Sequence, residues 1–127
     1  MPQPITKLEK NPHVVIDEDA LAESPEMAAL VCRIFALWAS IERELRVLLV
    51  RLLGANAAPA HAIFSILQTQ ALQTKALEAA ARNTLNELDF EYFSAFMSVI
   101  GSVQKTRNKL AHWSWAACQG RPDLLLL

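Results

Sequence analysis

A run of apolar residues at helical spacing, between Met27 and Leu52, constrains the fold more than any other feature of this sequence. The members of the run recur every three or four residues: Met27, Leu30, Val31, Ile34, Leu37, Trp38, Ile41, Leu45, Leu48, Leu49 and Leu52. Ser24 and Pro25 are typical of a helix start, and Gly54 is typical of a helix end. The sequence therefore predicts a long amphipathic helix over residues 25–53 that needs helical partners.

Further helices are predicted after Gly54. The second runs from Pro59 to about residue 67, and the third covers about residues 69–85, unless the two form one kinked helix. Ser65 and Gln68 have the spacing of a capping box, which places the break near them. The fourth helix runs from residue 87 or 88 to about Ala117, and its apolar stripe consists of Phe93, Phe96, Met97, Ile100 and Val103.

These elements predict an all-α fold, a four- to five-helix up-and-down bundle over residues 24–118. An extended or mobile arm at residues 1–23 precedes the bundle, and its apolar residues 14–16 are the segment expected to dock. The tail at residues 119–127 ends in four leucines. We expect this tail to dock on the bundle as a strand or coil, or else the chain to be a fragment.

Charge is unevenly distributed along a chain whose net charge is only −1. Two lysines and six acidic residues give residues 1–26 a charge of −4, while ten basic and seven acidic residues give residues 27–127 a charge of +3. The molecule as a whole has no basic field for nonspecific nucleic-acid binding, although the predicted bundle is mildly basic.

The two cysteines, Cys32 and Cys118, show no metal-binding spacing. We expect both to be reduced and mostly buried, and we expect no metal or other cofactor. No apolar run approaches the roughly 20 residues of a membrane helix, and the N-terminus lacks the apolar segment of a signal peptide. Together with reduced thiols, these features predict a cytoplasmic protein with no membrane partner.

Two charged residues fall on stripes that should be buried. Glu42 lies at the edge of the first helix's apolar stripe, so its carboxylate needs a partner unless it reaches solvent. Projecting the fourth helix's stripe forward gives core positions 107 and 111, of which Ala111 fits the core and Arg107 does not. One interpretation is structural, with Arg107 and Glu42 forming a buried ion pair between the two helices. The other is functional, because local inconsistencies of this kind are expected at functional sites.

The fourth helix carries Arg107, Asn108 and His112 close to its predicted end. This Arg-Asn-x-x-Ala-His pattern, late in a long helix of an all-helical domain, resembles the motif of the HEPN superfamily, named for higher eukaryote and prokaryote nucleotide-binding domains. The coarse order of helices extends the resemblance over residues 24–118. It implies a dimer in which two motifs meet in a shared cleft. It also implies metal-independent ribonuclease activity, often in toxins or defence effectors, and a separately encoded antitoxin as a common partner.

The residues of the motif suit such a reaction. Histidine titrates in the range needed to shuttle a proton from the 2′-hydroxyl of RNA, so His112 is the candidate acid and base. The guanidinium of Arg107 offers a planar set of donors for phosphate oxygens. Asn108 lies four residues before His112 on the same helix face, where it could orient the imidazole.

Helix geometry places Arg107 and His112 about 140° apart, so one straight helix cannot aim both at one phosphate. A two-fold dimer removes this objection, because the histidine of one copy can face the arginine of the other. Lys105 and Lys109 share the His112 side and would bind substrate phosphates. Trp113, like Trp115, would stack on bases or form dimer contacts, unless both tryptophans pack in the bundle.

The sequence therefore favours a metal-independent endoribonuclease with catalytic residues Arg107, His112 and Asn108 and with a substrate surface of Lys105, Lys109 and Trp113. RNA is its expected substrate and a second copy its expected partner. The alternative is a non-catalytic HEPN-like homodimer that acts as a protein-interaction or regulatory module.

Overall fold

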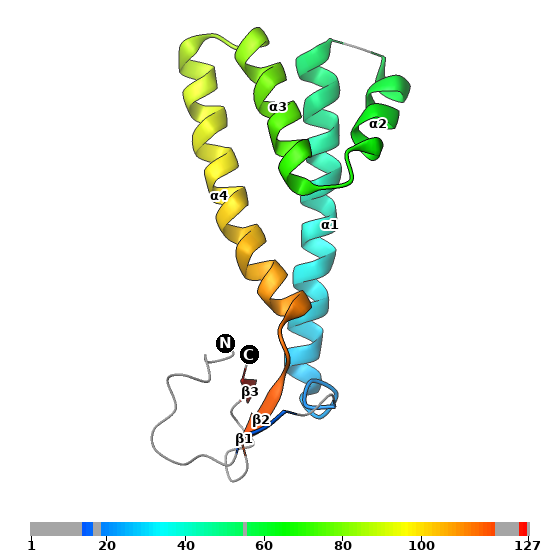
Figure 1. Ribbon diagram of the computed structural model, residues 1–127, viewed down its shortest axis with the longest axis vertical. Helices are drawn as coiled ribbons and strands as arrows, with labels where there is room; N and C mark the ends of the chain where they lie inside the picture. The colour runs from blue at the N-terminus through cyan, green and yellow to red at the C-terminus, as the bar shows by residue number, and fades with distance from the viewer. Residues whose placement is uncertain (1–13, 17–18, 55, 119–124, 127) are drawn as a thin grey trace. The chain divides into compact units, whose positions relative to one another are not determined.

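The structure, a computed structural model, describes residues 14–16, 19–54, 56–118 and 125–126. Most of these residues belong to four helices, namely α1 (Pro25–Leu53), α2 (Ala57–Ile66), α3 (Gln70–Thr84) and α4 (Glu87–His112) (Figure 1). The expectation of an all-α fold is confirmed, and α2 and α3 are separate helices. The chain divides into two compact units, one of residues 37–104 and one that combines the parts before residue 37 and after residue 104.

Side-chain caps and one glycine set the helix ends. Asn56 and Thr69 cap α2 and α3, since their side-chain oxygens accept hydrogen bonds from backbone N–H groups of the first turn, both at 3.3 Å. Ser65 does not cap α3 as the sequence suggested, because its hydroxyl donates to the carbonyl of His61 at 2.8 Å. Gly54 ends α1 with a φ of +56°, a left-handed conformation that glycine adopts without strain.

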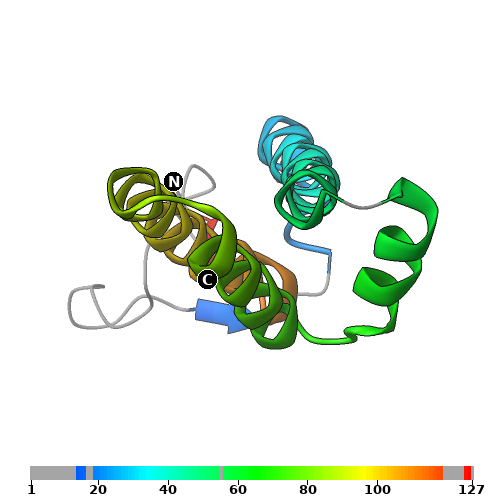
Figure 2. The same ribbon diagram turned by 90° about the horizontal axis from the view of Figure 1, so that it is seen from above.

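The unit of residues 37–104 has a continuous apolar core to which all four helices contribute. Its buried members are Trp38, Leu45, Leu49, Leu52, Phe64, Leu77, Ala80, Ala81, Phe93 and Ile100. Seen from above, α1 and α3 lie between α2 and α4 (Figure 2). This arrangement explains why α3 can be rich in alanine, since small side chains let a central helix approach its neighbours closely.

The apolar stripes of α1 and α4 include side chains that are not part of the buried core. Leu30, Ile34 and Leu37 were predicted to be buried on α1, but all three are exposed. Phe96 and Val103 on α4 are exposed in the same way. Sequence periodicity correctly found the apolar side of each helix, but it could not show how much of that side other helices cover.

The other unit contains a small antiparallel sheet. Its strands are β1 (Val14–Ile16), β2 (Ala116–Cys118) and β3 (Leu125–Leu126), in the spatial order β1-β2-β3. Val15 lies opposite Ala117, and Ala117 lies opposite Leu125. Residues 14–16 of the N-terminal arm and Leu125 and Leu126 of the tail are therefore held by strand pairing. Residues 1–13, 17–18, 119–124 and 127 of these two segments lie outside the described residues.

The prediction that the fourth helix reaches Ala117 was wrong, because α4 ends at His112 and Ala116 lies fully buried in β2. The buried position near the end of α4 is Leu110, and Ala111 is exposed. The helix propensity of Ala116 and Ala117 favoured a fourth helix that includes them. Pairing with β1 and β3, which are distant in sequence, makes this stretch a strand instead.

Cys32 is exposed on α1, so the expectation of a buried thiol is wrong there, and the side chain of Cys118 lies outside the described residues. Within the described ranges, no helix is long and apolar enough to cross a membrane.

Candidate functional site

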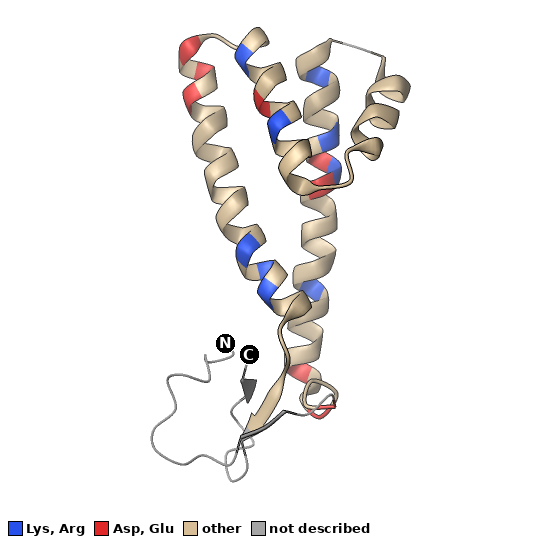
Figure 3. Cartoon of the chain, viewed as in Figure 1, with Lys and Arg blue, Asp and Glu red and all other residues tan. Residues whose placement is uncertain are grey.

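The last two turns of α4 present a basic face. Lys105, Lys109 and His112 are exposed, and their spacing of four and three residues places them within about 60° of one another around the helix. No Asp or Glu occurs in the sequence between Glu91 and Asp123. Figure 3 shows the resulting polarity of α4, with acidic residues at its start and basic residues toward its end. We call Lys105, Lys109 and His112 the basic face.

Trp113 borders the basic face. The Nζ atom of Lys109 lies 4.9 Å from the centre of the Trp113 ring, within the range of a cation–π contact. The indole is half exposed, while Trp115 is partly buried just before β2. Of the two tryptophans, Trp113 is therefore the one whose ring is more accessible to solvent.

Arg107 points away from the basic face toward α1. Its guanidinium carbon lies 5.4 Å from the centre of the Phe35 ring, and its Nη1 donates a 3.0 Å hydrogen bond to Oδ1 of Asn108. The side chain is partly buried, and its Nε atom is buried. An aromatic face on the neighbouring helix thus explains how an arginine fits an apolar stripe. Sequence reasoning missed Phe35, because it lies beside the main stripe of α1 and carries no chemical signal of its own.

Arg107 and Asn108 are in contact with each other, while His112 stands apart. In the part of the chain that the structure describes, His112 makes no hydrogen bond or ion pair, so Asn108 does not orient it in this conformation. The imidazole is solvent-accessible at the last residue of α4. The catalytic roles assigned to the three residues from the sequence remain predictions.

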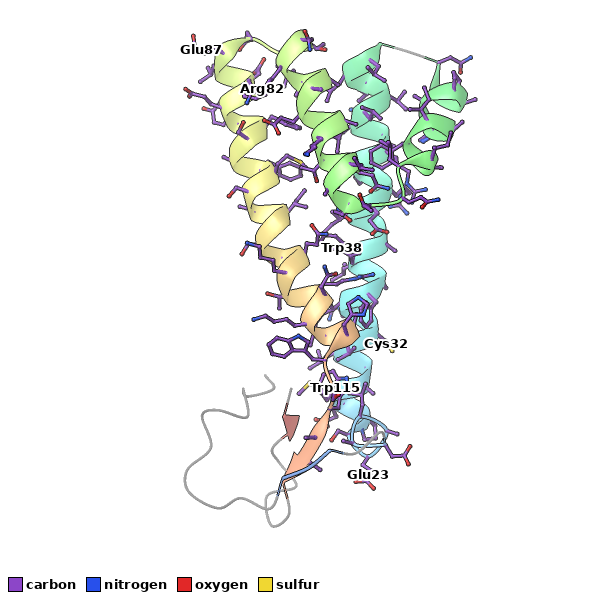
Figure 4. All side chains as sticks on the ribbon, in the orientation of Figure 1. Glu23, Cys32, Trp38, Arg82, Glu87 and Trp115 are labelled. Atoms are coloured by element: carbon purple, nitrogen blue, oxygen red, sulfur yellow. The ribbon has the colours of Figure 1, made fainter. Side chains whose placement is uncertain are left out.

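Glu42 has a partner on its own helix. The indole Nε1 of Trp38, which is buried and labelled in Figure 4, donates a 2.7 Å hydrogen bond to Oε1 of Glu42. Arg46 donates from Nε to the backbone carbonyl of Glu42 at 3.3 Å. Glu42 belongs to the unit of residues 37–104 and Arg107 to the other unit, and the ion pair predicted between them remains a prediction.

Replacing Glu42 with alanine is expected to lower the free energy of unfolding by about 1–3 kcal/mol, because the buried Trp38 indole loses its carboxylate acceptor. Glu42→Gln keeps a side-chain oxygen at the same position and should recover most of this loss. Urea denaturation of both variants measures the difference. Equal destabilisation by Ala and Gln would show that the charge of Glu42, rather than its hydrogen bond to Trp38, is what matters.

Comparisons with known proteins find no match to any family model, curated protein or solved structure. Among the described residues, no group of three or more His, Cys, Asp and Glu side chains is placed to hold a metal ion. The side chains at the end of α4 are therefore the basis on which we infer a function.

Proposed function

We propose that this protein is a HEPN-like, metal-independent endoribonuclease that works as a homodimer. The observation that carries the proposal is the basic face, where two lysines and a histidine are exposed together with no carboxylate in the surrounding sequence. Such a surface attracts the phosphates of a single-stranded nucleic acid, and an adjacent accessible indole can stack on its bases. His112 adds a group that can transfer protons near neutral pH.

In the proposed reaction, the 2′-hydroxyl oxygen of one nucleotide attacks the adjacent phosphorus. His112 accepts the hydroxyl proton as the new P–O bond forms, and the P–O bond to the 5′ oxygen of the next nucleotide breaks. The imidazolium then returns the proton to that leaving oxygen. The products are a 2′,3′-cyclic phosphate and a free 5′-hydroxyl, and DNA is not cleaved because it lacks the nucleophile.

The arginine that stabilises the pentavalent phosphorane is proposed to come from the second copy. Arg107 is directed toward Phe35 and Asn108, whereas the basic face lies on another side of α4. Only a neighbouring molecule can therefore bring an Arg107 guanidinium to the phosphate beside a given His112 without rebuilding the helix. Fixed donors of this kind act where negative charge develops in the transition state.

Incubation of the purified protein with mixed RNA in EDTA tests the proposal. We expect cleavage that persists in EDTA and products that carry 2′,3′-cyclic phosphate ends, with no cleavage of DNA of the same sequence. Loss of all cleavage on adding EDTA would contradict the mechanism, because no step in it uses a metal ion.

The lysines of the basic face should govern RNA affinity. Replacing both Lys105 and Lys109 with alanine is expected to weaken binding to single-stranded RNA of any sequence. It should also reduce the slope of log K against log salt by about 0.7 for each lost phosphate contact. Lys75→Ala removes an exposed lysine from α3 and is the matched control. Fluorescence anisotropy at several salt concentrations makes the comparison, and equal slopes for all variants would exclude this RNA surface.

The second candidate function is a non-catalytic homodimer that serves as an interaction module. The observation that favours it is the position of Arg107, whose contacts with Phe35 and Asn108 already give this residue a structural use. A dimer that binds RNA without cleaving it, or that does not bind RNA at all, would favour this alternative.

A further inference from the structure

A small polar pocket lies between α1, α2 and α3 within the unit of residues 37–104. It has a volume of about 240 Å³, and it is lined by Glu42, Arg46, Phe64, Ser65 and Gln73. Four of these five side chains are polar, whereas Phe64 is 2% exposed and belongs to the core. Pockets for drug-sized ligands usually measure roughly 300–1,000 Å³, so this pocket suits a smaller and more polar molecule.

Two residues that line the pocket, Glu42 and Arg46, carry opposite charges but do not form an ion pair. They are four residues apart on α1 with the glutamate first, which is the spacing and order that favour an ion pair on a helix. Glu78 and Arg82 have the same spacing and order on α3, and their side chains meet at 2.9 Å. Among the described residues, no such contact joins Glu42 to Arg46. The two charges at the pocket are therefore kept apart where an equivalent pair elsewhere in the chain has formed.

Hydrogen bonds to other groups hold these two charges apart. Oε1 of Glu42 accepts from the buried indole of Trp38 at 2.7 Å, and Nε of Arg46 donates to the backbone carbonyl of Glu42 at 3.3 Å. Within the described part of the chain, Oε2 of Glu42 and the two terminal nitrogens of Arg46 make no hydrogen bond to the protein. Both side chains are half-buried, and a partly desolvated charge without a partner is unfavourable. A ligand that pairs with both charges would remove this cost.

Gln73 and Ser65 complete the polar lining of the pocket. Nε2 of Gln73 donates to the carbonyl of Leu67 at 2.9 Å, and Oγ of Ser65 donates to the carbonyl of His61 at 2.8 Å. Each of these bonds orients the side chain and leaves an oxygen, Oε1 of Gln73 or Oγ of Ser65, that can accept a hydrogen bond from a ligand. The pocket thus presents one negative group, one positive group and two neutral acceptors. Because hydrogen bonds already orient these side chains, little of their conformational entropy is lost on binding.

We propose that this pocket binds a free α-amino acid with a small polar side chain. The ligand's ammonium group donates to Oε2 of Glu42, and its carboxylate accepts from the guanidinium of Arg46. A ligand with a single charge would leave the other charge of the pocket without a partner, and an uncharged nucleobase would leave both. A hydroxyl or amide on the ligand's side chain supplies donors for Gln73 and Ser65. None of the residues that line the pocket belongs to the basic face, so the inference is independent of the proposed ribonuclease activity.

Isothermal titration calorimetry of the full chain with L-serine and L-asparagine tests the ligand class. Each amino acid is compared with its N-acetyl derivative, which lacks the ammonium group, and with its methyl ester, which lacks the carboxylate. We expect at least one of the two amino acids to bind, and both of its derivatives to bind about tenfold more weakly or worse, because each loses a charge-assisted hydrogen bond. The inference is overturned if neither amino acid binds at millimolar concentration, or if a derivative or free cytosine binds as tightly as the amino acids do.

Two variants assign the charges of the pocket to the two ends of the ligand. Glu42→Gln keeps an oxygen for the Trp38 indole but removes the negative charge, so Kd for the amino acid should rise about tenfold or more and the preference over the N-acetyl derivative should disappear. Arg46→Met keeps the aliphatic stem, and it should remove the preference over the methyl ester instead. Circular dichroism checks that both variants are folded.

The matched control is Glu44→Gln, which removes an exposed charge from the same helix outside this pocket. This variant should leave Kd for the amino acid unchanged. A folded Glu42→Gln protein that binds the amino acid as tightly as Glu44→Gln does would overturn the inference, as would an Arg46→Met protein that still prefers the amino acid over its methyl ester.

Discussion

Replacing His112 with alanine is expected to lower the rate of RNA cleavage by about 10²–10⁴-fold, the usual contribution of a positioned acid and base. The protein should stay folded, because His112 is exposed at the last residue of α4 and makes no hydrogen bond or ion pair within the described part of the chain. Single-turnover cleavage of a labelled RNA measures the effect.

The matched control for this variant is His61→Ala. His61 lies on α2, is partly buried, and does not belong to the basic face. Its replacement should leave the cleavage rate within a few-fold of the parent. A His112→Ala protein that cleaves as fast as His61→Ala would remove His112 from the mechanism.

Leu77→Ala is expected to cause the largest loss of stability of the substitutions considered, about 2–5 kcal/mol in the free energy of unfolding. Leu77 has 0% of its surface exposed and belongs to the core that all four helices share. Removal of its side chain leaves a cavity in that core, which the surrounding helices can fill only by shifting. Urea denaturation followed by circular dichroism measures the loss.

Leu72→Ala makes the same chemical change on the same helix at a position that is 48% exposed. This variant should lower the free energy of unfolding far less than Leu77→Ala does, typically by no more than about 1 kcal/mol for a half-exposed surface position. Similar losses for the two variants would mean that the core is not centred on α3. A small loss for Leu77 alone would mean that the four helices pack less tightly than the burial of this residue implies.

Much of the fold follows from local sequence signals. The helix start at Pro25 and the end at Gly54 come from residue types whose backbone preferences are strong. The break between α2 and α3 was predicted at about the right place, but the cap of α3 is Thr69 rather than Ser65. The three-stranded sheet does not follow from such signals. Val15 and Ala117 pair across almost the whole length of the chain, and strands of two or three residues are too short to show an alternating pattern.

The candidate site is predictable only in part. Helical spacing correctly placed Lys105, Lys109 and His112 on one face, because spacing alone decides which residues of a helix are neighbours. It could not show that Arg107 meets Phe35, since contacts between helices depend on tertiary packing. The exposure of Leu37 on α1 and of Phe96 on α4 could not be predicted from the sequence either, because a buried and an uncovered apolar stripe have the same periodicity.

In the proposed mechanism each site is composite, because it combines Arg107 of one copy with His112 of the other. Mixing two inactive variants tests this arrangement most directly. Arg107→Gln and His112→Ala should each abolish cleavage when pure. Random exchange makes half of the dimers mixed, and in a mixed dimer one of the two composite sites keeps both Arg107 and His112. We therefore expect the mixture to regain about a quarter of the parent's activity. Two variants that are inactive alone and remain inactive together, although they exchange subunits, would contradict it.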